Sequence, residues 1–122
     1  IRNADDAAKI FYDSWDHDTI EHFETVKLLL LNRAHQVLGI TTLSQGGLTG
    51  SVIDIRLIAQ YALSANASAV ILAHNHPSGN LTPSDADIAI SAKVKAALEL
   101  LDIQLLDHLI LISDGRYESI SL

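Results

Sequence analysis

The sequence predicts an α/β fold in which helices flank a mixed central sheet. Apolar residues recur at helical spacing in three segments, and between them lie short runs that are continuously apolar or rich in β-branched residues. The resulting order of helix, two strands, helix, strand, helix and further strands predicts a mixed sheet with helices packed against it. A length of 122 residues with 48% apolar residues suits one core, so we expect a single domain covering residues 1–122.

The N-terminal part of the chain predicts a helix followed by a hairpin. Asn3 is placed to cap a helix that reaches about Ser14 and carries acids near its positive end. Residues 26–31 form a short apolar run, and residues 36–43 are rich in Val, Ile and Thr, as expected for two strands. The polar residues 32–35 between them are typical of the turn of the hairpin.

The middle of the chain predicts a loop, a helix and a buried strand. Residues 45–50 contain three glycines and indicate a loop, in which we expect Gly46-Gly47 to form a lip beside a cleft. Asp54 can cap the helix that follows, and Asn66 would end it. Residues 69–73 are continuously apolar, which is expected of a strand buried on both faces. This strand runs directly into His74.

The C-terminal part predicts a long helix and two more strands. Thr82 is placed as the N-cap, with Pro83 at the first helical position and an acid three residues after the cap. Residues 105–113 supply strand material interrupted by a polar pair. The Asp-Gly dipeptide at residues 114–115 is a strong hairpin signal, leading into a strand at residues 117–120.

Composition excludes several environments and ligand types. The longest apolar runs, residues 28–31 and 69–73, are far shorter than the roughly 20 residues that cross a bilayer, so we expect no membrane partner. The N-terminus shows no signal-peptide pattern, and the chain has no cysteine, which together favour a cytoplasmic protein. Without thiolates, any zinc must be held by His, Asp or Glu.

The charge of the chain argues against nucleic acid as a direct partner. The formal net charge is −7, from 15 acidic residues against 8 basic ones, and the basic residues are scattered. A nucleic-acid-binding face normally gathers basic residues that displace counterions from phosphates. We therefore expect no direct binding to nucleic acid, while a homo-oligomer remains compatible with the sequence.

Four residues between positions 74 and 87 predict a catalytic zinc site. His74 and His76 are two residues apart in an extended segment, so both imidazoles face one point. Asp87, one turn into the following helix, can offer a third ligand, which leaves a tetrahedral zinc ion with a position for water. Ser84, three residues before Asp87, lies on the same helical face, where its hydroxyl could reach a developing oxyanion.

These residues also resemble a known family. The His-Asn-His-Pro run that opens residues 74–79, together with Ser84 and Asp87, resembles the JAMM (MPN+) motif. With Ser-Gly completing that run and Asp-His-Leu-Ile at residues 107–110, the chain is similar to the bacterial RadC family from about Glu24 onward. The resemblance implies a JAMM fold related to cytidine deaminases. Members often carry an N-terminal helix-hairpin-helix region, which we expect to be absent here.

The resemblance further implies zinc held by His74, His76 and Asp87, with a glutamate from an early strand as the base. The family pattern falls best on Glu24, which precedes a threonine and an apolar strand, and Glu21 is the alternative. A carboxylate there could take a proton from water and pass it to the leaving amine.

The pair Asp107-His108 carries two interpretations. It could orient a metal ligand by a hydrogen bond from behind, as such ligands often require. It could equally be a buried hydrogen-bonded pair that closes the sheet. The other histidines, at positions 17, 22 and 35, have no mutual spacing that makes a site, and we expect them on the surface.

The predicted function is that of a zinc-dependent metallopeptidase or isopeptidase acting on a peptide or protein substrate. Two alternatives are a DNA-repair-associated factor, which is the historical label of the family resembled, and a non-catalytic protein-docking module. A nucleoside deaminase is disfavoured because its cysteine ligands are absent.

Overall fold

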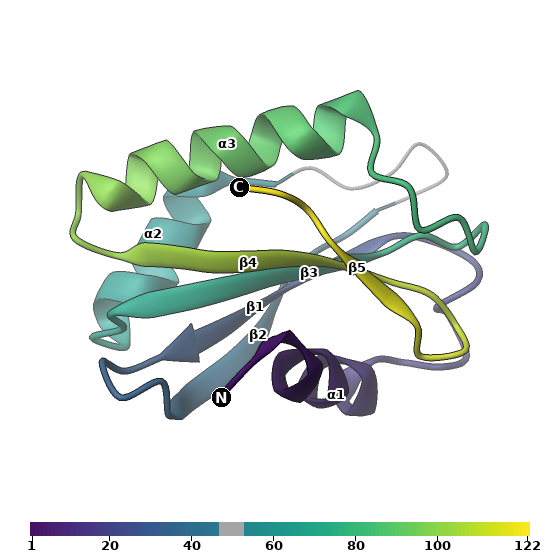
Figure 1. Cartoon of the computed structure of the whole chain (residues 1–122), viewed down its shortest axis with the longest axis horizontal. Helices are drawn as coiled ribbons and strands as arrows, with labels where there is room; N and C mark the ends of the chain where they lie inside the picture. Colours follow the sequence, from purple (N-terminus) through teal and green to yellow (C-terminus); the bar gives the residue numbers. More distant parts are fainter. Residues whose placement is uncertain (47–52) are drawn as a thin grey trace.

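A five-stranded sheet with helices on both faces forms the centre of the computed structural model, which describes residues 1–46 and 53–122 (Figure 1). Its strands lie in the order β2-β1-β3-β4-β5. In chain order the elements are α1 (Ala4–Ser14), β1 (Thr25–Leu31), β2 (Val37–Gln45), α2 (Ile55–Ser64), β3 (Ala69–Asn75), α3 (Asp85–Glu99), β4 (Gln104–Leu111) and β5 (Tyr117–Ser119). The predicted fold class is confirmed.

Pairing within the sheet is mixed, as expected. Strand β1 is antiparallel to both β2 and β3, β3 is parallel to β4, and β4 is antiparallel to β5. Helix α3 supplies the crossover that a parallel pair requires, so it connects the end of β3 to the start of β4. None of the helices in the described part of the chain has both the length and the apolar character needed to span a bilayer.

The two faces of the sheet carry separate cores. On β3, Ala69, Ile71 and Ala73 pack with the buried side of α1, whereas Val70 and Leu72 pack with α2 and α3. Because side chains alternate along a strand, His74 points to the α3 side. Figure 1 shows α1 on one side of the sheet and α3 on the other.

Strand β4 contains a bulge that sets the direction of His108. The pairing with β3 passes from Leu105 directly to Asp107, so Leu106 is an extra residue in the ladder. Leu105 therefore packs in the core beneath α2 and α3 while Leu109, four residues later, packs in the α1 core. His108 is buried on the α3 side as a result. The expected interruption at the polar pair is wrong, because β4 continues through it.

The predicted boundaries of α1 and α2 are confirmed, whereas the predicted end of β2 is wrong. Asn3 and Asp54 cap α1 and α2 with their side chains, and Asn66 follows the end of α2 with φ of 55°. Gln45, expected in a loop, is the last residue of β2, because this strand pairs with the whole length of β1. Of the lip expected at Gly46-Gly47, Gly46 is described, and its N–H donates to the carbonyl of Glu24 at 2.7 Å, whereas residues 47–50 lie outside the described residues.

The N-cap of α3 is Ser84, and the prediction of Thr82 with Pro83 at the first helical position is wrong. The Ser84 hydroxyl accepts a hydrogen bond from the Asp87 backbone N–H at 3.0 Å, and the Asp87 carboxylate accepts one from the Ser84 N–H at 2.9 Å. This capping box satisfies two N–H groups that a helix start leaves without partners. It also fixes the direction of the Asp87 carboxylate.

Candidate metal centre

The two histidines of the motif lie where β3 ends. His74 is buried, with 3% of its surface exposed, and His76 is the first residue after the strand. Their Nε2 atoms are 3.0 Å apart. The alternation along β3 and the turn of the chain after Asn75 thus bring both imidazoles to one point, as the spacing predicts.

Asp87, in the first turn of α3, brings its carboxylate to the same point, with a different oxygen near each histidine. Its Oδ1 lies 3.3 Å from Nε2 of His74, and its Oδ2 lies 3.2 Å from Nε2 of His76. Ligands bound tetrahedrally at 2.0–2.1 Å from zinc are about 3.3 Å from one another. Two imidazole nitrogens and one carboxylate at these separations fit a zinc ion.

Glu24 approaches the same point from the start of β1. In the antiparallel pairing of β1 with β3, Val26 lies opposite His74, so Glu24 precedes the strand on the side of the two histidines. Its carboxylate oxygen lies within 4.8 Å of the ligand nitrogens of His74 and His76. The alternative candidate, Glu21, is exposed and is not part of this group.

Asn75, between the two histidines, points to the opposite face and holds the segment that carries Glu24. Its amide nitrogen donates to the carbonyls of Ile20 at 2.8 Å and Phe23 at 2.9 Å. Its oxygen accepts from the Thr25 N–H at 2.7 Å. Asn75 is fully buried, so these bonds connect two parts of the chain that are far apart in sequence. Sequence reasoning did not assign it this role.

The ring of His76 is fixed from behind by the following turn. Its Nδ1 lies 2.6 Å from the carbonyl oxygen of Asn80, in a turn where Gly79 has φ of 83°. A carbonyl only accepts, so Nδ1 carries the proton and Nε2 presents its lone pair to the centre. Hydrogen bonding of this kind is usual behind histidines that bind metals.

The ring of His74 is contacted from behind by His108. Nδ1 of His74 lies 2.8 Å from Nε2 of His108, whose Nδ1 lies 2.5 Å from the hydroxyl of Ser91. Asp107 instead accepts from the backbone N–H of His108 and from the hydroxyl of Ser119. Asp107 is thus bonded to His108 through the backbone and to β5 through Ser119, while of this pair only the ring of His108 contacts a predicted ligand.

Two pKa shifts follow from this packing. Partial burial on its own raises the pKa of Asp87, but the close approach of the His74 imidazole and the hydrogen bond from the Ser84 backbone outweigh it, and the pKa lies below its ordinary value. Burial lowers the pKa of His108 to about 3, and the neighbouring His74 acts in the same direction. Asp87 is thus an anion and His108 is neutral at pH 7.

A small cavity opens beside this group. Its volume is about 160 Å³. The lining consists of three ionisable residues, Glu24, His74 and Asp87, and four apolar residues, Val26, Ile53, Ala86 and Ile90. An uncharged wall beside charged groups raises the strength of electrostatic interactions there.

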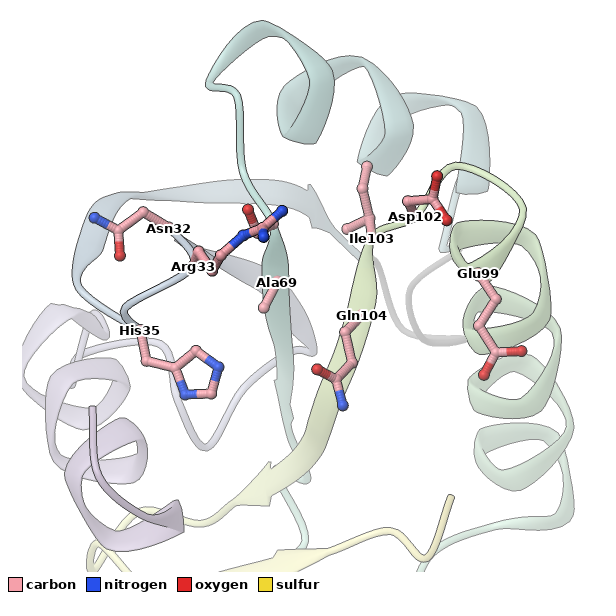
Figure 2. Close-up of a pocket in the computed structure, with 9 residues that line it drawn as sticks. Asn32, Arg33, His35, Ala69, Glu99, Asp102, Ile103 and Gln104 are labelled. Carbon is pink, nitrogen blue, oxygen red and sulfur yellow. The ribbon is translucent and has the colours of Figure 1, made fainter.

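A second pocket, of about 480 Å³, lies at the other end of β3 and α3 (Figure 2). It is lined by Ala69, the first residue of β3, and by Glu99, the last residue of α3. Figure 2 shows His35 and Glu99 on opposite sides of the strands that carry Ala69 and Gln104. Its polar groups do not converge as those of the metal centre do.

The other histidines do not join the metal centre. His17 and His22 are exposed, as expected, and the ring of His17 packs against that of Tyr12. His35 is half-buried in the hairpin turn with φ of 60°. Within residues 1–46 and 53–122, the cluster of potential ligands forms only around His74 and His76.

A JAB-type domain is the class of protein that this fold and this group of side chains define. The sequence model of the RadC-like JAB domain matches residues 1–122, the whole chain. The chain therefore belongs to the RadC-like JAB domain family, and JAB domains as a class include zinc metallopeptidases.

Relatives with similar sequences carry a family name without an activity. A UPF0758 protein of Flavobacterium johnsoniae is 46% identical over 92 residues, which is 75% of this chain and 40% of that protein. A UPF0758 protein of Moorella thermoacetica is 42% identical over 120 residues, which is 98% of this chain and 51% of that protein. The chain thus spans about half the length of these relatives, or less.

Proposed function

We propose that this domain is a zinc-dependent peptidase or isopeptidase that hydrolyses an amide bond with activated water. The observation that carries the proposal is the cluster of His74, His76 and Asp87. The two Nε2 atoms are 3.0 Å apart, and each lies 3.2 or 3.3 Å from a different oxygen of the carboxylate. Three protein ligands leave a fourth tetrahedral position open, which is typical of a catalytic zinc site. Glu24 beside this cluster supplies the carboxylate that such chemistry needs.

Zinc bound by the three residues would polarise an amide carbonyl and lower the pKa of a water molecule. Glu24 then accepts the proton of that water and delivers it to the departing nitrogen. The three hydrogen bonds of Asn75 hold the segment on which Glu24 lies, which limits the movement of its carboxylate during both transfers.

Ser84 is proposed to stabilise negative charge on the carbonyl oxygen. Its hydroxyl oxygen already accepts from the Asp87 N–H, and this bond uses a lone pair of the oxygen while leaving the O–H able to donate. The side chain is exposed at the start of α3, where the helix dipole also favours an anion.

The size of the cavity supports a peptide or protein substrate. About 160 Å³ is well below the roughly 300–1,000 Å³ of sites that enclose a small molecule. It has room for one small side chain beside the scissile bond, in contact with Val26 and Ile90. The rest of such a substrate would lie outside, which suits a chain that continues on both sides of the amide.

The test is cleavage of a peptide and isopeptide library by the zinc-reconstituted protein, with products identified by mass spectrometry. Three controls are required: metal-free protein, the Glu24→Gln variant and the His74→Ala/His76→Ala double variant. We expect cleavage by the zinc-containing parent alone. Stoichiometric zinc without cleavage of any library member would refute the peptidase and favour a docking module. Cleavage that persists in the metal-free protein would refute the zinc mechanism.

A further inference from the structure

Three consecutive polar contacts connect two of the metal ligands through the interior. Nδ1 of His74 lies 2.8 Å from Nε2 of His108, and Nδ1 of His108 lies 2.5 Å from the Ser91 hydroxyl. That hydroxyl lies 2.8 Å from the backbone carbonyl of Asp87. Ser91 and His108 are fully buried, so water does not compete for these contacts.

The proton positions along these contacts follow from the last of them. The carbonyl of Asp87 can only accept, so the single hydroxyl proton of Ser91 is donated to it. The oxygen of Ser91 then accepts from His108, whose Nδ1 must carry a proton. Neutral imidazole carries one proton, so Nε2 of His108 is bare and accepts from Nδ1 of His74.

We propose that Ser91 and His108 are positioning residues that hold the proton of His74 on Nδ1 and keep its Nε2 bare and directed at the metal centre. The proposal rests on the metal site of the proposed function and adds two residues to it. The Asn80 carbonyl likewise holds the proton of His76 on Nδ1, so both imidazoles present Nε2 to the metal centre. The contacts also tie the first turn of α3 to the end of β3, which sets the distance between Asp87 and His74.

The bulge in β4 makes this arrangement possible. Leu106 occupies an extra place in the ladder, and His108 therefore pairs with Leu72 on the α3 side. With a regular ladder through Leu106, the alternation from Leu105 would turn the ring of His108 toward α1. The irregularity of the sheet thus places the ring of His108 behind His74.

The proton positions can be measured without metal or substrate. Long-range proton–nitrogen NMR of the metal-free protein at about pH 8, where an ordinary imidazole is neutral, reports the tautomer of each histidine. We expect His108 with its proton on Nδ1. A proton on Nε2 of His108 would reverse every contact and overturn the proposal.

A second experiment tests whether these contacts strengthen metal binding. It measures zinc affinity by competition with a chromophoric chelator. Ser91→Ala removes one oxygen atom and is expected to weaken zinc binding by about 10- to 100-fold. His108→Leu should do the same, and His108→Gln should restore part of the affinity because its oxygen can accept from His74. Ser64→Ala, at an exposed position of α2, is the matched control and should have no effect.

The outcomes separate this proposal from the proposed function. Affinity of Ser91→Ala within twofold of the parent would refute a positioning role, even where His108→Leu fails to fold. Absence of zinc binding by the parent, with the His108 tautomer as expected, would refute the metal function and leave the proton arrangement standing. Changed affinity with no peptide cleavage would refute the peptidase alone.

Discussion

The replacement of Asn75 by alanine should destabilise the protein and misplace Glu24 without removing a metal ligand. Asn75 makes three hydrogen bonds to the backbone of Ile20, Phe23 and Thr25, and it is fully buried. At about 0.5–1.5 kcal/mol for each bond, the free energy of unfolding should fall by about 2–4 kcal/mol. For a domain of this size, such a loss corresponds to a fall in Tm of about 10 °C.

Urea unfolding of the metal-free variant measures the loss of stability. Zinc titration and peptide cleavage measure whether the ligands still bind the metal and whether Glu24 is misplaced. Zinc affinity should change less than the cleavage rate, because His74 and His76 keep their own contacts while the segment of Glu24 loosens. Gln60→Ala, on the exposed side of α2, is the control and should alter stability by less than about 0.5 kcal/mol. An Asn75→Ala variant as stable as this control would refute the reasoning.

Four further predictions address the proposed chemistry and its setting. Glu24→Gln should keep zinc and lower the cleavage rate by about 10² to 10⁴; a parent-like rate in Glu24→Gln together with a loss in Glu21→Gln would move the base to Glu21. His74→Ala/His76→Ala should lose the single zinc by elemental analysis, and tight stoichiometric zinc in that variant would exclude the site. In the metal-free protein, His108 has its pKa lowered to about 3 by burial, so the unfolded chain binds a proton that the folded chain does not. The contribution of neutral His108 to stability is therefore fully present above about pH 6.5, and the free energy of unfolding should fall by up to about 1.4 kcal/mol per pH unit toward pH 4. The slope should be smaller in His108→Gln. Equal slopes in urea titrations of the two proteins would contradict this prediction. The net charge of −7 predicts no sub-micromolar binding to duplex DNA in about 150 mM salt, and a steeply salt-dependent affinity would return the repair interpretation to first place.

The sequence predicts well what depends on neighbours along the chain. The buried strand ending in His74 and the placement of Asp87 one turn into the next helix both follow from local patterns. The start of that helix is the exception, because the local pattern placed the cap at Thr82, two residues too early. In the structure the reciprocal hydrogen bonds between Ser84 and Asp87 make Ser84 the cap of the helix.

What depends on strand register and irregularity was beyond reach of the sequence. The resemblance favoured Glu24 over Glu21, but that Glu24 lies beside the two histidines follows only from the pairing of β1 with β3. The contacts of Asn75 span about 50 residues, and nothing in its spacing between two histidines indicated them. Ser91 did carry a signal, since it lies four residues after Asp87 and so on the same helix face. The direction of the His108 side chain had no such signal in the sequence, because the bulge at Leu106 reverses the alternation of side chains along β4.

The same bulge bears on how the length of β4 can vary between relatives. Leu106 is an additional residue, so its deletion would leave a regular ladder with Leu105, Asp107 and His108 still opposite their present neighbours on β3. Deletion of Asp107 should behave alike, since Leu106 could take its place in the ladder. A homologue that is one residue shorter here can therefore keep its histidine behind the metal ligand. The same deletion after His108 would turn the end of the strand over and exchange the residues of the two cores.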